Sequence, residues 1–255
     1  MEKSNIQRSF ARASVSYDEF ANLQRKVGLN LLEMLAGQIP AGVILDLGCG
    51  TGFLTRELSR IVDHNKIIAM DLAFPMLEVA REKHGNQFFC ADIERLPVRS
   101  EAIDWIFSNL ALQWCVDLQK VFSQFRSVLK PGGQFFFSTF GPQTFQELKQ
   151  SWAMVDDYSH VNHFYSVEQI QRFMGQAGLT TCQIECINQQ SYYSNVVTLM
   201  KEIKGIGAHN MTQNRNRNIT SKRQLHDLVA AYEKFRINGK ICATFEIIYV
   251  AGKLA

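Results

Sequence analysis

The chain has 255 residues and a mass of 29.1 kDa, and its 46% hydrophobic and 20% charged residues suffice for the core of one large α/β domain. No run of about 18 apolar residues that could span a membrane occurs, and the first twenty residues lack the apolar region of a secretory signal. The six cysteines form no CxxC pair, so we expect neither a disulfide framework nor a metal site, and we expect the protein to lie in the reducing cytoplasm. A net charge of +3 is too small to indicate a nucleic-acid partner.

Strands and helices are predicted to alternate along most of the chain. Val43–Leu47 has the pattern of a buried parallel strand, because it is a short apolar run that ends in a glycine-rich turn. The pattern then predicts helix Phe53–Ile61, strand Lys66–Met70, helix Pro75–Lys83, strands Gln87–Cys90 and Ile103–Ser108, helix Leu118–Leu129, strand Gln134–Phe140, helix Ser166–Ala177 and strands Cys182–Asn188 and Ala243–Ala251. This order predicts a Rossmann-like α/β fold with a seven-stranded, mostly parallel, doubly wound sheet.

Three segments lie outside that minimal sheet. They are a mostly helical leader within residues 1–36, the polar and aromatic stretch Gly141–Tyr165, and Asn195–Asn238 with its asparagine- and arginine-rich loop. None carries enough apolar residues for a core of its own, so we expect them to cover one core over residues 43–140. The whole chain, residues 1–255, is therefore predicted to be a single domain.

The glycine-rich turn after the first strand indicates a nucleotide-like ligand. Gly48, Gly50 and Gly52 give the spacing GxGxG, which differs from the GxGxxG of dinucleotide-binding turns. Glycine at these positions lets the backbone approach a ligand without a clash from Cβ. The preceding Asp46 suits a cationic group better than a phosphate, as in the α-ammonium of S-adenosylmethionine.

Two further acidic residues follow predicted strands. Asp71 ends the second strand, where a carboxylate can accept hydrogen bonds from both ribose hydroxyls of an adenosine, although it could also serve only as a helix cap. Asp92 follows the third strand and is placed to accept from an adenine amino group, with Ile93 against the ring face. A simple turn residue is the alternative for Asp92.

These features together resemble the class I S-adenosylmethionine-dependent methyltransferases. The resemblance rests on VILDLGCGTG, the two acidic positions and LKPGG before the fifth strand, and it covers roughly residues 43 to 140. It implies an S-adenosylmethionine site formed by Asp46, Gly48, Gly50, Gly52, Asp71, Leu72, Asp92, Ile93 and Asn109.

Motifs outside this region resemble one family of such enzymes, the malonyl-acyl-carrier-protein O-methyltransferases of biotin synthesis. The leader matches F-x-R-A-x-x-x-Y-x-x-x-A-x-L-Q from Phe10 to Gln24, and SNLALQW follows the fourth strand. HVNHF at 160–164, KGIGA at 204–208 and an Ile219-Thr220 pair in place of the family's Leu-Thr extend the match toward residue 228.

The resemblance implies methylation of the free carboxyl group of a malonyl thioester. It places Tyr17 and Gln24 over the cofactor, Gln113 and Trp114 as acceptor-positioning residues, and His160 and Asn162 near the substrate. A malonyl carboxylate has a pKa near ~4 and is ionised at neutral pH, so no general base is expected. Trp114 could instead be a core residue, and Tyr17 could merely anchor a helix.

The segment Asn195–Asn238 carries eight Lys and Arg residues against three Asp and Glu residues. This basic excess, which includes Lys204 and Arg217, suits an acidic partner such as an acyl carrier protein bearing the malonyl thioester. A solvated basic loop is the alternative.

Two other functions stay open at this stage. A methyltransferase acting on another small molecule, such as a quinone precursor, would share the core motifs but need a base for a phenol or carbon acceptor. A non-catalytic S-adenosylmethionine-binding partner of another enzyme is the third possibility, against which the complete set of cofactor residues argues.

Overall fold

The computed structural model describes residues 2–84, 87–208, 210 and 220–254, and its centre is one mixed β-sheet. The strand order is β3-β2-β1-β4-β5-β8-β6, with the short β7 paired to β8. The five strands from β3 to β5 are parallel, and β8 runs antiparallel to both β5 and β6. The bounds are β1 Ile44–Leu47, β2 Ile67–Asp71, β3 Gln87–Cys90, β4 Ile103–Asn109, β5 Leu129–Phe140, β6 Leu179–Tyr193, β7 Arg236–Ile237 and β8 Lys240–Leu254.

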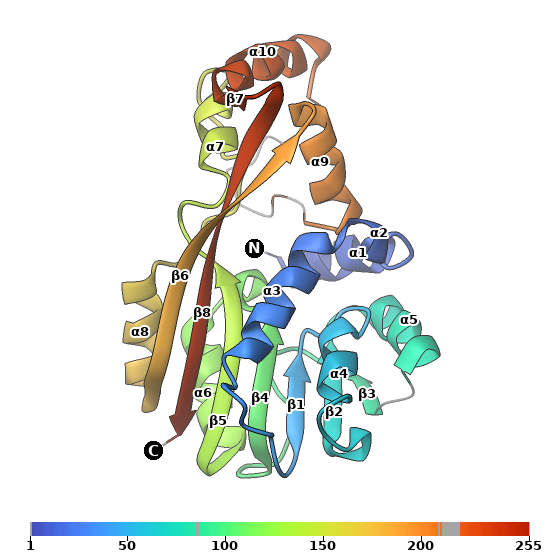
Figure 1. Ribbon diagram of the computed structural model, residues 1–255, viewed down its shortest axis with the longest axis vertical. Coiled ribbons are helices and arrows are strands. Elements are labelled where there is room, and N and C mark those ends of the chain that lie inside the picture. Colours follow the sequence, from blue (N-terminus) through green and yellow to red (C-terminus); the bar gives the residue numbers. More distant parts are fainter. Residues whose placement is uncertain (1, 85–86, 209, 211–219, 255) are drawn as a thin grey trace.

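This sheet confirms the predicted doubly wound α/β architecture. The chain order reverses between β1 and β4, and in such sheets ligands bind outside the carboxyl ends of the strands at that reversal. Figure 1 shows these carboxyl ends pointing upward, toward α1 and α2.

Helices cover both faces of the sheet. Helices α3 (Asn22–Glu33) and α4 (Phe53–Leu58) bury Val27, Leu31 and Leu58 against one face. On the other face, α6 (Leu118–Val128) and α8 (Val167–Gln176) bury apolar side chains such as Phe122 and Ile170. Helix α5 (Phe74–His84) packs on β2 and β3, and the short helical turns are η1 His64–Lys66, η2 Leu112–Trp114 and η3 Glu233–Phe235.

The last two long strands extend well beyond their predicted bounds. β6 and β8 pair continuously from Leu179 opposite Leu254 to Tyr193 opposite Ile241, so each is 15 residues long. The hydrophobic pattern underestimated β6 because its sequence is largely polar and most of its side chains are exposed. At the far end, Asn238 and Gly239 have φ values of 50° and 78°, as a tight β7–β8 hairpin turn requires.

The extended ends of β6 and β8 carry a helical lobe above the sheet. It contains α7 (Gln146–Trp152), α9 (Val196–Gly205) and α10 (Lys222–Tyr232) (Figure 1). Its buried side chains, among them Trp152, Leu199 and Tyr232, belong to the same apolar cluster as Leu31 and Phe136 of the main core. Two of the predicted covering segments therefore pack together around these strands.

The leader forms α1 (Lys3–Ala13) and α2 (Tyr17–Phe20), which lie between this lobe and the carboxyl ends of the parallel strands (Figure 1). Gln7 Nε2 of α1 donates to the backbone oxygen of Leu72, just after β2, at 3.0 Å. Among the described residues, no helix is long and apolar enough to cross a membrane, and no group of three or more His, Cys, Asp or Glu residues could hold a metal ion.

The lobe is joined to β8 through a buried carboxylate, which gives a test of the fold. Glu147 of α7 accepts hydrogen bonds from Thr244 N at 2.9 Å and from Thr244 Oγ1 at 2.5 Å, and both residues are buried. We expect Glu147→Ala to lower the free energy of unfolding by about 2–3 kcal/mol, because it leaves buried donors unpaired. Urea denaturation measures the change, and Gln150→Ala on the exposed side of the same helix is the control. Equal stability of both variants would contradict this role of Glu147.

Candidate active site

The turn between β1 and α4 presents backbone to an open space. Gly48, Gly50 and Gly52 all have positive φ, at 68°, 56° and 84°. A Cβ at Gly48 would lie 2.3 Å from the Cβ of Ala111, whereas a Cβ at Gly50 would meet only Tyr17, at 4.0 Å. Gly48 therefore allows close packing of two loops, and Gly50 leaves room for a ligand.

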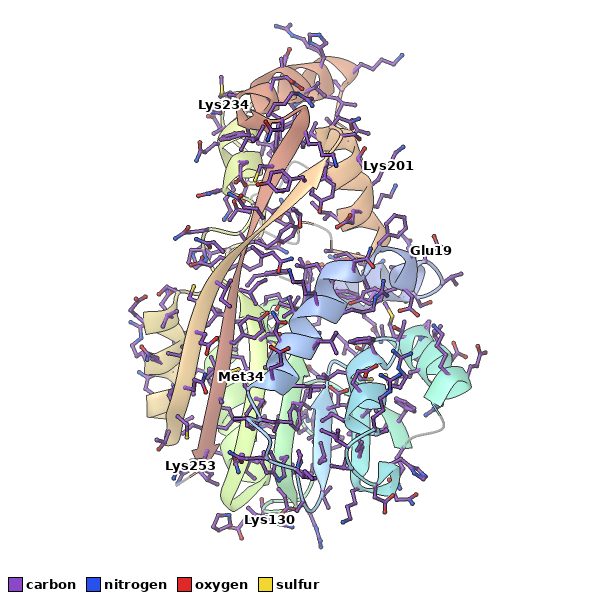
Figure 2. All side chains as sticks on the ribbon, viewed as in Figure 1. Glu19, Met34, Lys130, Lys201, Lys234 and Lys253 are labelled. Carbon is purple, nitrogen blue, oxygen red and sulfur yellow. The ribbon has the colours of Figure 1, made fainter. Side chains whose placement is uncertain are left out.

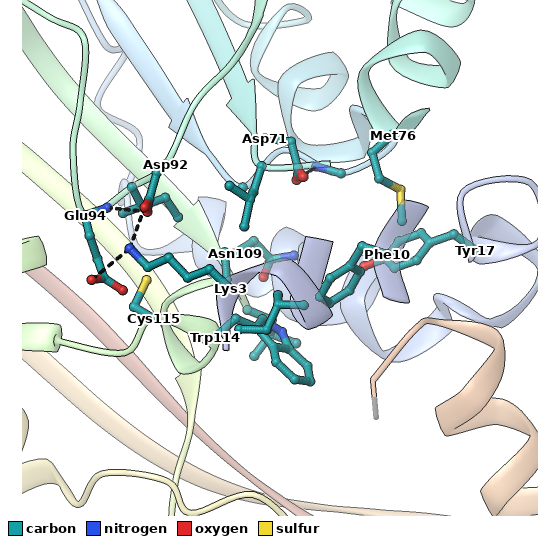
Figure 3. A pocket seen from close by; sticks show the side chains of 17 residues that line it. Lys3, Phe10, Tyr17, Asp71, Met76, Asp92, Glu94, Asn109, Trp114 and Cys115 are labelled. Carbon is teal, nitrogen blue, oxygen red and sulfur yellow. Dashed lines mark hydrogen bonds and ion pairs between the residues drawn. The ribbon is translucent and has the colours of Figure 1, made fainter. Parts of the chain in front are cut away.

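A first cavity lies at this turn, beneath α1 (Figure 3). Its volume is ≈ 90 Å³, below the roughly 300–1,000 Å³ of ordinary small-molecule pockets, and Lys3, Ile6 and Phe10 of α1 line one side of it. The cavity unites nine of the residues that the sequence singled out: Tyr17, Gly48, Gly50, Asp71, Leu72, Asp92, Ile93, Asn109 and Trp114.

Asp71 caps a helix, as one of its two predicted roles required, and its role toward a ribose stays a prediction. Its Oδ1 accepts from Ala73 N at 2.8 Å near the start of α5, and its Oδ2 accepts from Gly50 N at 3.0 Å. Burial raises the pKa of Asp71, and the backbone donors oppose that shift. Each carboxylate oxygen has a further lone pair, so Asp71 can cap the helix, fix the glycine turn and still accept from a ligand in the cavity.

Asp92 lies beside a lysine that the sequence analysis missed. Lys3 Nζ lies 2.5 Å from Asp92 Oδ2 and 2.9 Å from Glu94 Oε2 (Figure 3). Glu94 is buried and also accepts from Val116 N at 2.6 Å. No signal pointed to Lys3, because it precedes the leader motif and its two partners are about ninety residues away.

Asp46 and Gly52 do not line this cavity, and their role as ligand contacts stays a prediction. Asp46 is buried, and its Oδ2 accepts from Thr55 Oγ1 of α4 at 2.6 Å. Burial raises the pKa of Asp46 to about 7. Gly52 is the residue before α4 and allows the positive φ needed there. In this structure, both residues stabilise the conformation of the glycine turn.

Asn109 links the cavity to the leader. Its Nδ2 donates to Gln24 O at 2.9 Å, and its Oδ1 accepts from Ser138 Oγ at 2.8 Å. The side-chain oxygen Oε1 of Gln24 is buried and has no hydrogen-bond partner among the described residues. A buried acceptor without a donor is costly, and this atom is the one buried side-chain acceptor left without a partner among the described residues.

A second, larger cavity adjoins the first at Trp114. Its volume is ≈ 420 Å³, and Trp114 lines both cavities. The wall is mainly apolar and aromatic, with side chains from α7, α9 and the segment after α7. The Phe10 ring of α1 meets the Trp114 ring edge to face, with centroids 5.2 Å apart. Figure 3 shows the two rings side by side in the first cavity, and Trp114 is the one that also lines the second.

The second cavity contains three predicted substrate residues: His160, Asn162 and Lys204. The His160 ring stacks on Trp152 at a centroid distance of 3.6 Å, and its Nε2 lies 2.7 Å from Asp156 Oδ1. His160 is thus held rigidly in the wall. Arg217, the fourth predicted residue, lies outside the described residues.

Gln113 lines neither of these cavities but lines a hollow of ≈ 270 Å³ that it shares with Asn162, and its role in the acceptor pocket stays a prediction. Its Nε2 donates to Leu110 O at 2.7 Å, and its Oε1 accepts from Thr139 Oγ1 at 3.3 Å. Leu110 has a positive φ of 48°, an uncommon conformation for this residue. Gln113 therefore stabilises the turn that positions Asn109 and Trp114.

The phenol of Tyr17 is a poor proton acceptor. Burial raises its pKa, and the carboxylates of Asp71 and Asp18 raise it further. Tyr17 remains protonated at neutral pH and can act only as a donor or a wall. The geometry therefore suits a reaction between two bound molecules that meet near Trp114, without a tyrosine base.

The protonation of Asp46 gives a stability test. Its pKa is about 7 when folded and 3.8 ordinarily, so unfolding releases a proton between these values and stability falls as pH rises from 4 to 7. Asp46→Asn removes this pH dependence. As the pH rises, the unfolding free energy of the variant minus that of the wild type should therefore increase by up to about 1.4 kcal/mol per pH unit. Denaturant titrations across this range measure the difference, with exposed Asp157→Asn as control. A constant difference would contradict a raised pKa.

Comparison with known proteins agrees with this geometry. The family model described as a methyltransferase domain matches residues 45–137, which run from β1 to β5. The YcgJ protein of Bacillus subtilis has the same fold, with a TM-score of 0.64 at 20% identity over 89% of this chain and 97% of that one. Together with the sheet order, these matches show the class I methyltransferase fold.

Sequence relatives are more specific. A malonyl-[acyl-carrier protein] O-methyltransferase from Nitrosospira multiformis is 36% identical over 98% of this chain and 88% of its own length. The biotin biosynthesis bifunctional protein BioHC of Cellvibrio japonicus is also 36% identical over 98% of this chain, which spans 50% of that longer protein. Similarity of this extent covers the leader and the lobe as well as the core, and the chain belongs to the malonyl-[acyl-carrier protein] O-methyltransferase family.

Proposed function

We propose that this protein transfers a methyl group from S-adenosylmethionine to the free carboxylate of a malonyl thioester carried by an acyl carrier protein, as the first step in making a pimeloyl chain for biotin. The observation that carries the proposal is the pair of cavities that meet at Trp114, one lined by nucleoside-type contacts and the other apolar. The names of the full-length relatives support the malonyl acceptor.

The residues of the first cavity fit the parts of S-adenosylmethionine. Asp71 would hold the ribose hydroxyls, and Asp92 with Ile93 would hold the adenine amino group and ring face. The open backbone at Gly50 and the unpartnered Gln24 Oε1 near Asn109 fit the methionyl end with its ammonium. When bound, the cofactor supplies a methyl group activated on a sulfonium.

The protein's own contribution is binding, alignment and exclusion of water. A malonyl carboxylate is already ionised at neutral pH, so no residue has to remove a proton from it. Trp114 and Phe10 enclose the junction where acceptor and donor meet, and the apolar second cavity removes water from the carboxylate. Correct positioning of two reactants alone is worth effective molarities of ~10⁵–10⁸ M.

Polar groups in the second cavity would orient the acceptor. Asn162 is buried in the wall, and His160 is fixed by Trp152 and Asp156. Few polar groups in an otherwise apolar wall give orientation and specificity in small-molecule sites. We assign Asn162 and His160 to the malonyl group and Lys204, at the exposed edge, to the approach of its carrier.

The ribose assignment can be tested at Asp71. We expect Asp71→Asn to weaken S-adenosylmethionine binding about 10- to 100-fold, because a neutral amide is a weaker acceptor for two hydroxyl groups. Calorimetric titration measures the affinity. Circular dichroism checks the fold, and Asp157→Asn serves as the surface control. Unchanged affinity would reduce Asp71 to a helix cap that fixes the glycine turn.

The acceptor can be tested with matched thioesters and pH. Malonyl carrier protein should gain 14 daltons, the mass of one CH₂, whereas acetyl carrier protein should be inert because it lacks a carboxylate. The value of kcat/KM should stay level between pH 6 and 8, since a group with a pKa of about 4 is ionised throughout. Mass spectrometry and initial rates measure both quantities.

A different acceptor would give a different dependence of activity on pH. A phenol or carbon nucleophile needs base assistance, so activity would rise with pH through roughly 6.5, the ordinary pKa of histidine. Turnover of the acetyl thioester, or a rising profile that His160→Ala abolishes, would refute methylation of a preformed carboxylate.

A further inference from the structure

A basic groove runs between α1 and α9, on the outside of the site. Its volume is ≈ 620 Å³, and four of its ten lining residues are cations: Arg8 and Arg12 of α1 and Lys201 and Lys204 of α9. No carboxylate lines it within the described part of the chain. Figure 2 shows Lys201 projecting outward from α9. We refer to these four residues as the basic groove.

No described carboxylate of this protein forms an ion pair with any of the four cations. Arg8 donates only to neutral oxygens, those of Ser4 and Asn5, and the other three form no ion pair with any described residue. Nearby carboxylates have other partners, since Asp18 pairs with Lys83 and Glu202 accepts from Tyr193. Like charges that line one groove repel each other, so an anionic ligand would be favourable here.

Two glycines at the end of α9 create this arrangement. A Cβ at Gly205 would lie 2.3 Å from the Phe20 ring, and one at Gly207 would lie 3.0 Å from Ser9 O. Gly207 also has a φ of 75°. Gly205 lets α9 approach α2, and Gly207 lets the end of α9 approach α1, which brings the two pairs of cations to the same groove. The KGIGA motif thus has a structural explanation.

The groove leads toward the acceptor cavity. Lys201 and Lys204 line both the groove and the ≈ 420 Å³ cavity that ends at Trp114. Arg8 and Arg12 line the groove but neither of the two cavities. A partner bound in the groove could therefore extend a flexible arm past the two lysines, while the two arginines contact only the partner.

We propose that the basic groove docks the acidic surface of the carrier protein, next to the phosphate from which its thioester arm extends. This inference rests on the proposed function, which supplies an acceptor on a carrier protein. It adds the α1 half of the surface, because the sequence placed the basic excess only within Asn195–Asn238. The occupant is an acidic protein, since four cations spread over two helices exceed what one phosphate needs.

The test reverses the two arginines that lie outside both cavities. In the full chain, Arg8→Glu with Arg12→Glu should raise KM for malonyl carrier protein about 10- to 100-fold at low salt, and the effect should shrink as salt screens the charges. The KM for malonyl-pantetheine, which has neither protein nor phosphate, should not change. The affinity for S-adenosylmethionine should not change either. Arg8→Lys with Arg12→Lys should keep most of the affinity.

The matched control has the same change in charge away from the groove. Lys26→Glu with Lys240→Glu alters two exposed lysines on α3 and β8 and should leave KM for the carrier protein near the wild-type value. Malonyl-coenzyme A separates phosphate from protein, because it carries phosphates but no acidic protein surface. In the arginine variant, the KM for malonyl-coenzyme A should rise much less than the KM for the carrier protein.

Each contrary result overturns the docking proposal in a recognisable way. An unchanged KM for the carrier protein, or an equal effect of the control, excludes this groove as the docking surface. If the KM for malonyl-coenzyme A rises as much as the KM for the carrier protein, the groove is a phosphate site alone. If the KM for malonyl-pantetheine also rises, the two arginines have a structural role in α1. If the wild type methylates no malonyl thioester, the proposed function fails. Calorimetric binding of carrier protein to wild type and arginine variant still tests the groove.

Discussion

The packing of α1 across the carboxyl edge of the sheet is the constraint on which the site depends. This one helix lines the first cavity with Lys3, Ile6 and Phe10 and lines the basic groove with Arg8 and Arg12. At one end it is bound by the ion pairs of Lys3, and at the other it abuts Gly207, which follows α9. The cavity of ≈ 90 Å³ therefore lies directly beneath α1, so the position of this helix sets the space at the glycine turn.

The long strands β6 and β8 determine where the second reactant can lie. They extend past the sheet and carry α7, α9 and α10 to a position above the strand ends, where the apolar cavity forms (Figure 1). Glu147 ties α7 to β8, and the hairpin at Asn238-Gly239 returns the chain along the same path. The lobe is therefore held relative to the sheet by the strands themselves, which keeps the acceptor cavity next to Trp114.

Local patterns in the sequence predicted the fold and most of the first cavity, because strand alternation and the glycine turn are local features. They did not predict features that depend on the direction of a side chain. Asp46 lies next to the end of β1 and Asp71 ends β2, but Asp46 turns toward Thr55, whereas Asp71 lines the cavity. Lys3 was missed because its partner Asp92 lies far along the chain. The hydrogen bond between Gln113 and Thr139 was not predicted for the same reason.

The distribution of charge connects these elements to the chemistry. Methyl transfer to a carboxylate joins a cation to an anion, and the attraction between them grows as water is removed. The site fits this requirement. Among the described residues, the cation of the first cavity, Lys3, is paired with Asp92 and Glu94. The unpaired cations stand at the outer groove and at the edge of the second cavity, and Trp114, which lines both cavities, packs against Phe10. A cation beside the junction would compete with the sulfonium for the carboxylate. Attraction of the carrier is thus separated in space from the alignment of the reacting groups.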